Sequence, residues 1–486
     1  MKSRALSPFG RGFSLRPWVM FGIFLMLVVL MGGGARSDIA SLPALRSLSV
    51  CVLFLTLATA TTGYWRDIRV PLILLSALAL WMILQLVPLP AGIWSALPGR
   101  DLVFQMDTLL GEGGRWRPIS MTPLLTVNSL LSLILPFTAL LAAAATPANG
   151  RIRLWWAIWF FGLASAALGL LQFMGGEGSV FYLYRITNEG SLVGLFSNRN
   201  HNALLLCASI LSAGWLLANQ LRQKVRHMLL VPALAGSIML FLLMVLIIGS
   251  RLGLICGMVS LVVISIVIRS GLRKRPKAIN QVPVSRKRAS QPGNMGRIAL
   301  SMLPFVAIIL VGGLFYLSDR ANAISRLIDG DGVEEIRVAA FPTVVELAGQ
   351  QWFAGAGFGS FANMFQIVEP DDLLRPPYFN HAHNDWLQLP IEGGLPAMII
   401  ALVALIWIAS SLVAIVRARS RAGSMNLMEG VTLGAAFGCF ALGSAVDYPL
   451  RTPSLMVVVA LLVVILARCR AEAADAAPRS KAASLS

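Results

Sequence analysis

The stretch GLPAMIIALVALIWIASSLVAIV, residues 394–416, runs for 23 positions without a charged side chain. A helix of that length rises about 35 Å, enough to cross the roughly 30 Å hydrocarbon layer of a membrane. Similar runs recur along the 486 residues, of which 57% are hydrophobic and 13% charged, against about 25% charged in a typical soluble domain. The sequence therefore predicts an all-α, polytopic membrane protein.

Twelve runs are long enough to span the membrane, and they divide the chain. We expect transmembrane helices at residues 17–34, 44–62, 70–90, 124–146, 154–174, 201–219, 228–249, 252–268, 298–318, 394–416, 430–446 and 453–468. Helices 1–9 thus occupy residues 1–318, with a basic linker at 270–297. Helices 10–12 occupy residues 394–468, and a tail follows at 469–486. Residues 319–393 form a large loop between helices 9 and 10, and a second long connection covers residues 91–122.

The charges sort onto two faces of this arrangement. The connections on the side of both termini hold 27 of the 40 basic and 4 of the 22 acidic residues, a net charge of +23. The opposite side holds 13 basic and 18 acidic residues, a net charge of −5. The positive-inside rule then places both termini in the cytoplasm and loop 319–393 outside. The total of +18 is an orientation signal, so we expect no nucleic-acid partner and an interaction with membrane lipids instead.

The stretch Asn380-His-Ala-His-Asn-Asp-Trp-Leu-Gln388, at the end of that loop, carries the densest group of reactive side chains. His381, His383 and Asp385 could supply three metal ligands, but no fourth ligand or known metal spacing accompanies them. A polar cap without chemistry is a second interpretation. A general base is the third, since histidine is the commonest choice near neutral pH.

Other parts of the loop predict local structure. Val333, Ile336, Ala340, Val344 and Leu347 recur at helical spacing, which predicts a helix with one apolar face. Arg337 lies on the same helix. Gly355-Ala-Gly-Phe-Gly359 follows and predicts a tight turn that brings the loop towards the bundle, because a nucleotide-binding fingerprint would need a strand and a helix around it. The five cysteines lie in or beside apolar runs and show no disulfide or zinc spacing.

His383-Asn-x-Trp-Leu-Gln388 followed by Glu392-x-Gly394 resembles the signature of the O-antigen ligase and polymerase superfamily, bacterial membrane proteins that join glycans. The resemblance covers about residues 70 to 460. Trp386 stands where relatives often have Tyr, Arg199 occupies a variable position, and residues 184–194 match only loosely. Further similar landmarks occur in the expected order: Pro118 to Thr126, Gly194 to Asn200, Ser250 to Gly253, Arg337, Gly355 to Phe361, and Asp447 to Leu450.

The resemblance implies a GT-C-like fold and an inverting, metal-independent glycosyltransferase without cofactors in the bacterial inner membrane. The implied donor is a glycan linked to a polyprenyl diphosphate, and the active site faces the periplasm. As a ligase the protein would use an acceptor such as lipid A core in lipopolysaccharide or surface polysaccharide biosynthesis, and as a polymerase it would use another lipid-linked repeat unit. One sequence does not separate these two reactions.

The resemblance also implies residue roles that suit this chemistry. His383 is expected to take the acceptor proton, with Asn384 and Glu392 in support and His381 as its neighbour. Asp447 is expected to orient an arginine. Every basic residue expected outside is arginine, whose planar guanidinium binds phosphate bidentately. The expected ligands of the donor diphosphate are Arg251, Arg337, Arg199 and Arg185.

Arg251 is the strongest of these candidates because it lies in a connection of about two residues between apolar runs. A charge is costly there without a partner or a water-filled cavity. An interfacial arginine that reaches towards lipid headgroups is the alternative. A transporter or flippase is a competing class of protein, but it predicts a long loop after helix 6, an internal 6+6 repeat and ionisable residues in the middle of spans, and the sequence shows none of these. A catalytically inert scaffold would not need the His383 segment.

Overall fold

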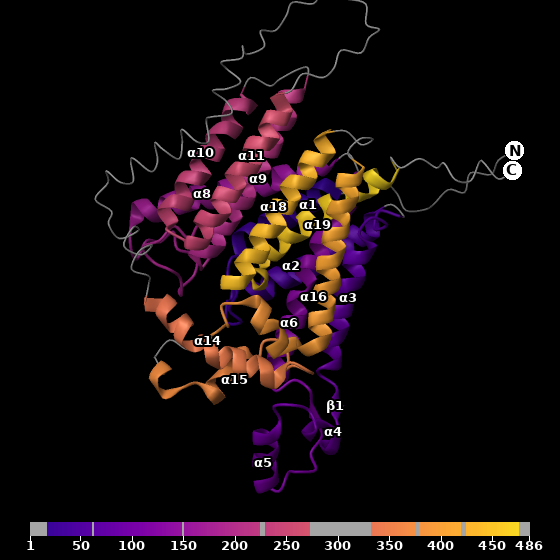
Figure 1. Cartoon of the computed structure of the whole chain (residues 1–486), viewed down its shortest axis with the longest axis vertical. Coiled ribbons are helices and arrows are strands. Elements are labelled where there is room, and N and C mark those ends of the chain that lie inside the picture. Colours follow the sequence, from indigo (N-terminus) through magenta and orange to yellow (C-terminus); the bar gives the residue numbers. More distant parts are fainter. Residues whose placement is uncertain are drawn as a thin grey trace, which may run out of the picture.

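The computed structural model describes residues 17–60, 63–147, 150–223, 229–272, 332–374, 379–418 and 424–475. These ranges are mainly helical (Figure 1), which confirms the all-α class. Strand pairing within them is limited to β1 (Pro88–Leu89) against β2 (Arg117–Pro118). The expected ninth span at 298–318 and the basic linker from residue 273 onward lie outside the described residues.

The apolar helices of the described ranges coincide with the other eleven expected spans. Nine are long and apolar enough to cross a membrane, and α1 and α3 are shorter. The total of twelve stays a prediction. The helices are α1 (Pro17–Met31), α2 (Ser41–Thr59), α3 (Arg69–Leu84), α6 (Pro123–Ser132) continuing into α7 (Ile134–Ala144), α8 (Arg151–Gly175), α9 (Arg199–Arg222), α10 (Leu230–Ile248), α11 (Arg251–Leu272), α16 (Asp385–Arg417), α18 (Ser424–Val446) and α19 (Pro453–Asp475).

Helix α16 begins nine residues before the expected start of its span. A break divides it at Gly394, whose φ of +60° and ψ of −162° are not helical. A side chain at this position would also collide with the backbone of Ala354 and Gly355, so only glycine fits. Residues 385–393 therefore form a separate helical segment outside the span, and the expected boundary between loop and membrane helix falls at the break.

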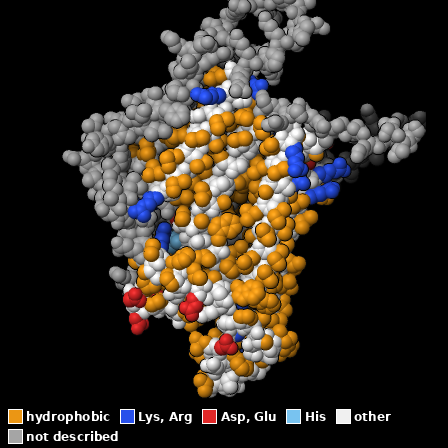
Figure 2. Space-filling view, in the orientation of Figure 1, with side chains coloured by type: hydrophobic (Ala, Val, Ile, Leu, Met, Phe, Trp, Pro, Cys, Tyr) orange, Lys and Arg blue, Asp and Glu red, His pale blue; other side chains and the backbone are white. Residues whose placement is uncertain are grey.

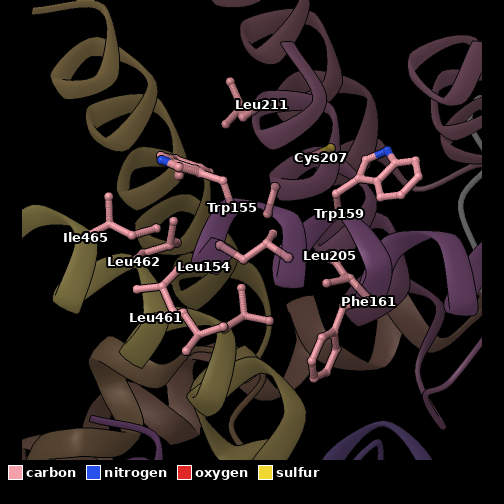
Figure 3. Close-up of a cluster of buried hydrophobic side chains, with 14 of the residues drawn as sticks. Leu154, Trp155, Trp159, Phe161, Leu205, Cys207, Leu211, Leu461, Leu462 and Ile465 are labelled. Atoms are coloured by element: carbon pink, nitrogen blue, oxygen red, sulfur yellow. The ribbon is translucent and has the colours of Figure 1, made fainter. Parts of the chain in front are cut away.

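Helix α9 forms the centre of one half of the bundle. In its most apolar 18 residues, 94% of the positions are buried, and α8, α10, α11 and α18 pack around it. Gly214 and Gly271 let α11 and α9 approach closely, with Gly214 against Ile264 and Gly271 against Ala218. Figure 3 shows large buried side chains of α8, α9 and α19 meeting around Trp155. This packing fixes the N-terminal end of α9, which contributes to the site.

The connections gather at two ends of the bundle, as alternating spans require. At one end Arg468 of α19 donates hydrogen bonds to the carbonyl oxygens of Ala143, Ala144 and Thr146, and Arg151 pairs with Glu429. On the face shown in Figure 2, most of the visible basic side chains lie towards that end and most of the acidic ones towards the other. This distribution of basic and acidic side chains agrees with the charge difference predicted between the two sides of the membrane. The assignment of the basic end to the cytoplasm stays a prediction.

The two long connections lie together at the acidic end. The first contains α4 (Ala91–Ser95) and α5 (Asp101–Leu109), and the second contains α14 (Gly332–Gln351), α15 (Phe361–Val368) and the short helix η2 (Asp371–Leu373) (Figure 1). Arg100, which is completely buried, joins them. It donates to Gln351 Oε1 at 2.6 Å, to the Gly355 carbonyl at 2.7 Å and to the Ile119 carbonyl at 2.9 Å.

Candidate functional site

His383 immediately precedes the cap of α16. Asn384 is the N-cap, and its Oδ1 accepts a hydrogen bond from the Leu387 amide at 3.1 Å. His383 has a φ of +48°, the only positive value for a residue other than glycine in the described ranges. Such a conformation costs free energy for a residue with a Cβ and is found preferentially at functional sites. The surrounding contacts therefore hold this imidazole in a fixed position.

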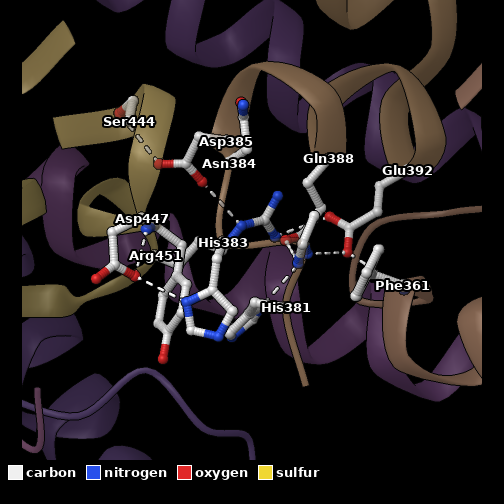
Figure 4. A network of polar contacts seen from close by, with 12 residues as sticks. Phe361, His381, His383, Asn384, Asp385, Gln388, Glu392, Ser444, Asp447 and Arg451 are labelled. Carbon is white, nitrogen blue, oxygen red and sulfur yellow. Dashed lines mark hydrogen bonds and ion pairs between the residues drawn. The ribbon is translucent and has the colours of Figure 1, made fainter. Parts of the chain in front are cut away.

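The imidazole of His383 contacts a buried carboxylate. Its Nδ1 lies 3.3 Å from Oδ1 of Asp447, which is 1% exposed (Figure 4). Burial opposes the charge of this carboxylate, but the hydrogen bond with His383 and the nearby histidine and arginine charges hold the pKa of Asp447 well below its usual value. We expected Asp447 to orient an arginine. In the structure its side chain contacts His383, and Arg337 acts on it through charge.

Asp447 is also held from the side of α9. Its Oδ2 accepts hydrogen bonds from Nδ2 of Asn198 at 3.0 Å and from Nδ2 of Asn200 at 2.8 Å. Oδ1 accepts a further bond from the Tyr448 amide at 3.0 Å. Asn198 itself is the N-cap of α9. The resembling segments at 194–200 and 447–450 thus meet on one carboxylate, although about 250 residues separate them.

The electrostatics suit His383 as a base. Burial lowers its pKa, the positive charge of Arg337 lowers it further, and the bond to Asp447 partly opposes both effects. The imidazole is therefore neutral at pH 7. Because an ionised carboxylate can only accept, Nδ1 carries the proton and Nε2 keeps its lone pair. This is the protonation state that a general base requires.

His381 has a different set of contacts. Its Nδ1 lies 3.2 Å from Nε2 of Gln388, which donates, and its ring centre lies 4.2 Å from that of Tyr448. Burial, assisted by the charge of Arg451, lowers its pKa well below the usual value. Both histidines lie in the site, but only His383 has a carboxylate within hydrogen-bonding distance.

Arg451 is the main residue that sequence reasoning missed. Its Nε donates to Oδ1 of Asp385 at 3.0 Å, and its Nη1 donates to Oε2 of Glu392 at 2.8 Å. It belongs to the short helix η3 (Pro449–Arg451). Burial opposes its charge, but the two carboxylates raise its pKa above the ordinary arginine value. The signal in the sequence was the arginine two residues after Asp447-Tyr448-Pro449.

This ion pair network changes the interpretation of Asp385. The carboxylate that could have completed a metal site is engaged by Arg451 and by the Ser444 hydroxyl at 3.1 Å. In the described part of the chain, no group of three or more His, Cys, Asp or Glu side chains is placed to hold a metal ion. Glu392 is completely buried, and its Oε1 also accepts from Gln388 Nε2 at 2.8 Å. The network fixes the first helical segment of α16.

A third histidine, His201, also reaches the cluster. It is 1% exposed, and its Nδ1 lies 3.0 Å from the Thr452 hydroxyl oxygen. Its Nε2 has no hydrogen-bond partner among the described residues and lies 3.9 Å from Oδ1 of Asp447. Its ring packs edge-on against Tyr448, with ring centres 5.1 Å apart. Sequence reasoning placed this residue at the start of an apolar span and assigned it no role.

The four candidate arginines lie at different distances from the carboxylate. Arg337 of α14 is half-buried, its Nε is buried and lacks a hydrogen-bond partner in the described ranges, and its charge acts on Asp447 and His383. Arg199 is the first residue of α9, between the two asparagines that bind Asp447. Arg185 is exposed, and its charge contributes to the lowered pKa of Asp38.

Arg251 begins α11 after the expected short connection. Gly249 adopts a left-handed conformation that ends α10, and the Ser250 hydroxyl accepts from the Gly253 amide at 3.1 Å. Gly253 lies against Ala203 of α9, so the first turns of α9 and α11 are neighbours. The structure thus brings the charge of Arg337 to Asp447, places Arg199 in the chain between the two asparagines that bind Asp447, and places Arg251 at the start of the neighbouring helix α11.

The Gly355–Gly359 turn approaches the bundle as expected. Its three glycines all have positive φ. The Ala356 amide donates to the Ile391 carbonyl at 2.7 Å and the Gly357 amide to the Glu392 carbonyl at 3.0 Å. The expected apolar face of α14 is confirmed for Ala340, Val344 and Leu347, which are buried.

A family model described as O-antigen ligase matches residues 236–402, a range that runs from α10 through α16 up to residue 402 and includes Arg251, Arg337 and His383. No curated protein matches the chain.

Proposed function

Because the chain belongs to the O-antigen ligase and polymerase superfamily, we propose that it transfers a glycan from a polyprenyl-diphosphate-linked donor to an acceptor hydroxyl on the outer face of the bacterial inner membrane. The observation that carries this proposal is the contact of the His383 imidazole with the Asp447 carboxylate, 3.3 Å between Nδ1 and Oδ1, beside the charge of Arg337. The residues proposed as base, orienting carboxylate and anion-binding group are therefore close enough to act together.

The donor is already activated, so the protein need only orient the substrates, remove a proton and stabilise the leaving group. The acceptor hydroxyl loses its proton to Nε2 of His383 as its oxygen attacks the anomeric carbon. The bond from that carbon to the phosphate oxygen breaks, and the polyprenyl diphosphate leaves with the electron pair. Asp447 stabilises the imidazolium that forms. Attack opposite the leaving group inverts the anomeric configuration.

Arginine guanidinium groups stabilise the diphosphate in this scheme without a divalent metal. Arg337 is the first candidate because its Nε is buried without a partner, a state that a phosphate oxygen would relieve. Arg199 and Arg251, at neighbouring helix starts, would bind from the other side. Arg185 is the least favoured of the four because it lies near Asp38.

In this proposal Asn384, Glu392 and His381 support the base because their contacts fix the backbone position of the segment that carries His383. Asn384 caps α16, Glu392 binds Arg451, and Gln388 connects Glu392 to His381. These contacts hold both ends of the His383 segment. None of them uses Nε2 of His383, the atom proposed to accept the proton.

The test is transfer by purified protein in vesicles that contain a lipid-linked donor. His383→Ala should lower the rate by about 10² to 10⁴, the usual contribution of a general base, while donor binding persists. His381→Ala serves as the matched control and should cost far less. An active His383→Ala protein at normal membrane level would refute the general-base assignment.

The polymerase reaction of the same superfamily remains the second candidate, because it uses the same donor and needs the same base. Glycan analysis of a deletion strain distinguishes them. Full-length but unattached polymer indicates a ligase, and single repeat units on the acceptor indicate a polymerase.

A further inference from the structure

Arg46 carries a charge inside a membrane-spanning helix without an acidic partner. It lies five residues into α2, about 7.5 Å along the helix from its first residue. Its Nη1 donates to Oδ1 of Asn128 and its Nη2 to Oγ of Ser132, both at 2.7 Å. Its Nε is buried and has no hydrogen-bond partner, and no ion pair within the described ranges includes it.

A guanidinium in this position is costly. The partners of its two Nη atoms are neutral, so no carboxylate balances the charge within the described residues, and the Nε–H donor has no acceptor there. Ionisable residues within spans usually face a cavity and mark a binding site. An anion bound beside Arg46 would accept a hydrogen bond from Nε and balance the charge.

Arg46, Asn128 and Ser132 line a cavity of about 820 Å³ between α2, α3, α6, α7, α16 and α19. Its volume lies within the range of about 300–1,000 Å³ that proteins use for small ligands. Figure 1 shows α16 and α3 side by side along this part of the bundle. Most of the wall is aliphatic and includes Leu74, Leu78, Leu140, Leu405, Ile408 and Val463.

The polar part of the cavity reaches the functional site. Asn380, His381, Asp385 and Arg451 line it, whereas none of Arg199, Arg251 and Arg337 does. The cavity is therefore distinct from the place proposed for the donor diphosphate, and it ends beside the histidines. A ligand lodged there would have apolar chains among the helices and an anionic group at Arg46.

We propose that this cavity binds the acceptor, as a phosphorylated lipid whose phosphate accepts from Arg46 and whose chains occupy the aliphatic part. The inference rests on the proposed function and narrows it, because it assigns acceptor and donor to separate sites on either side of the His383 segment. Charge complementarity selects the phosphate, and the aliphatic wall within the membrane selects the lipid.

Lipid binding by the purified full-length protein tests the site without requiring transfer. Native mass spectrometry counts ligands retained from dioleoyl phosphatidic acid, from dioleoylglycerol, which lacks the phosphate, and from inorganic phosphate, which lacks the chains. The wild-type protein should prefer phosphatidic acid over dioleoylglycerol by about tenfold or more, as expected for a charge-assisted contact. Inorganic phosphate alone should not displace the lipid.

Three variants locate the binding. Arg46→Gln should abolish the preference for phosphatidic acid. Arg115→Gln, a control at an exposed arginine paired with Glu112, should retain it. Arg251→Gln should also retain it, because the donor site is separate. Ala401→Phe fills the cavity from α16 and leaves Arg46 intact, so it should lower retention of both lipids. This variant tests the site even if Arg46→Gln does not fold.

Several results would overturn the proposal. Equal retention of phosphatidic acid and dioleoylglycerol would exclude phosphate recognition, and full displacement by inorganic phosphate would exclude lipid specificity. Loss of binding in Arg251→Gln but not in Arg46→Gln would place the lipid in the donor site. In the transfer assay, Arg46→Gln should raise the acceptor KM about tenfold with the donor KM unchanged. An unchanged acceptor KM would exclude the acceptor role even if lipid binds.

Discussion

Asp447→Asn tests the base and its orienting group together. The substitution preserves shape but removes the charge that faces His383 Nδ1 at 3.3 Å, inside a cluster that is almost completely buried. One side of the new amide is an NH₂ group. It must face either the imidazole or the two asparagine amides that now donate to Oδ2, so at least one donor meets another donor.

The expected loss can be worked from this geometry. A hydrogen bond to a charged group contributes about 1.5–3 kcal/mol, which corresponds to about 10- to 150-fold in rate. If the amide also turns the imidazole to the wrong tautomer, the loss approaches about 10⁴-fold, as for the orienting aspartate of a serine protease triad. We therefore expect transfer to fall by about 10- to 10⁴-fold.

The pH profile separates an orienting role from a structural one. Protonation of His383 removes the base, so the rate falls on the acid side of its pKa, and burial places that limb below the usual value of about 6.5. Asp447 raises this pKa, so its neutralisation should move the limb of kcat/KM to lower pH while the plateau falls. A merely destabilised protein would lose amplitude without moving the limb.

The assay is initial transfer rate in vesicles between pH 4.5 and 8.5, normalised to the amount of folded protein. Asp371→Asn, at an exposed aspartate in η2, is the matched control and should behave like the wild type. A limb that moves to higher pH, or a full-rate Asp447→Asn protein, would show that the carboxylate does not act on the base.

Four further outcomes are expected. Arg251→Lys should be almost as inactive as Arg251→Ala in the transfer assay, because a bidentate fork is proposed, and full activity with Lys would reduce this residue to an electrostatic anchor. Transfer should persist in EDTA, and activity that is lost on chelation and restored by a divalent ion would contradict an arginine-based site. Arg451→Met should destabilise the protein in detergent by about 3–5 kcal/mol, measured by thermal unfolding, because two buried carboxylates lose their partner. Cysteines at Asp371 and Arg470 should label from opposite sides of the membrane, and labelling from one side would remove the topology on which the site rests.

The sequence predicted the helices well because the membrane imposes a local rule. A spanning segment must satisfy its own backbone hydrogen bonds and must be apolar over about 20 residues, and both properties can be read from neighbouring positions. Eleven expected spans have helices in the described ranges. The His383 to Glu392 stretch was also recognisable, because its polar residues lie close together in the chain.

The partners in the site depended on the tertiary structure. His383 meets Asp447 across 64 positions, Arg451 reaches Asp385 across 66, and His201 reaches Thr452 across 251. No local pattern encodes these distances, because they follow from how α9, α16 and α18 pack. For this reason the contact between Asp447 and His383 and the ion pairs of Arg451 were not expected from the sequence.

The sequence by itself determined the fold class, the segment that carries the candidate base and the number of candidate arginines, since these depend on composition and on residues near one another in the chain. The contacts of α2 with α6 and of η3 with α16 decided which charges are compensated. The same residue type therefore plays different parts: Arg451 lies between two carboxylates, whereas Arg46 has only neutral partners beside a cavity. The free energy of a buried charge depends on the groups that surround it in space, and those groups come from distant parts of the chain.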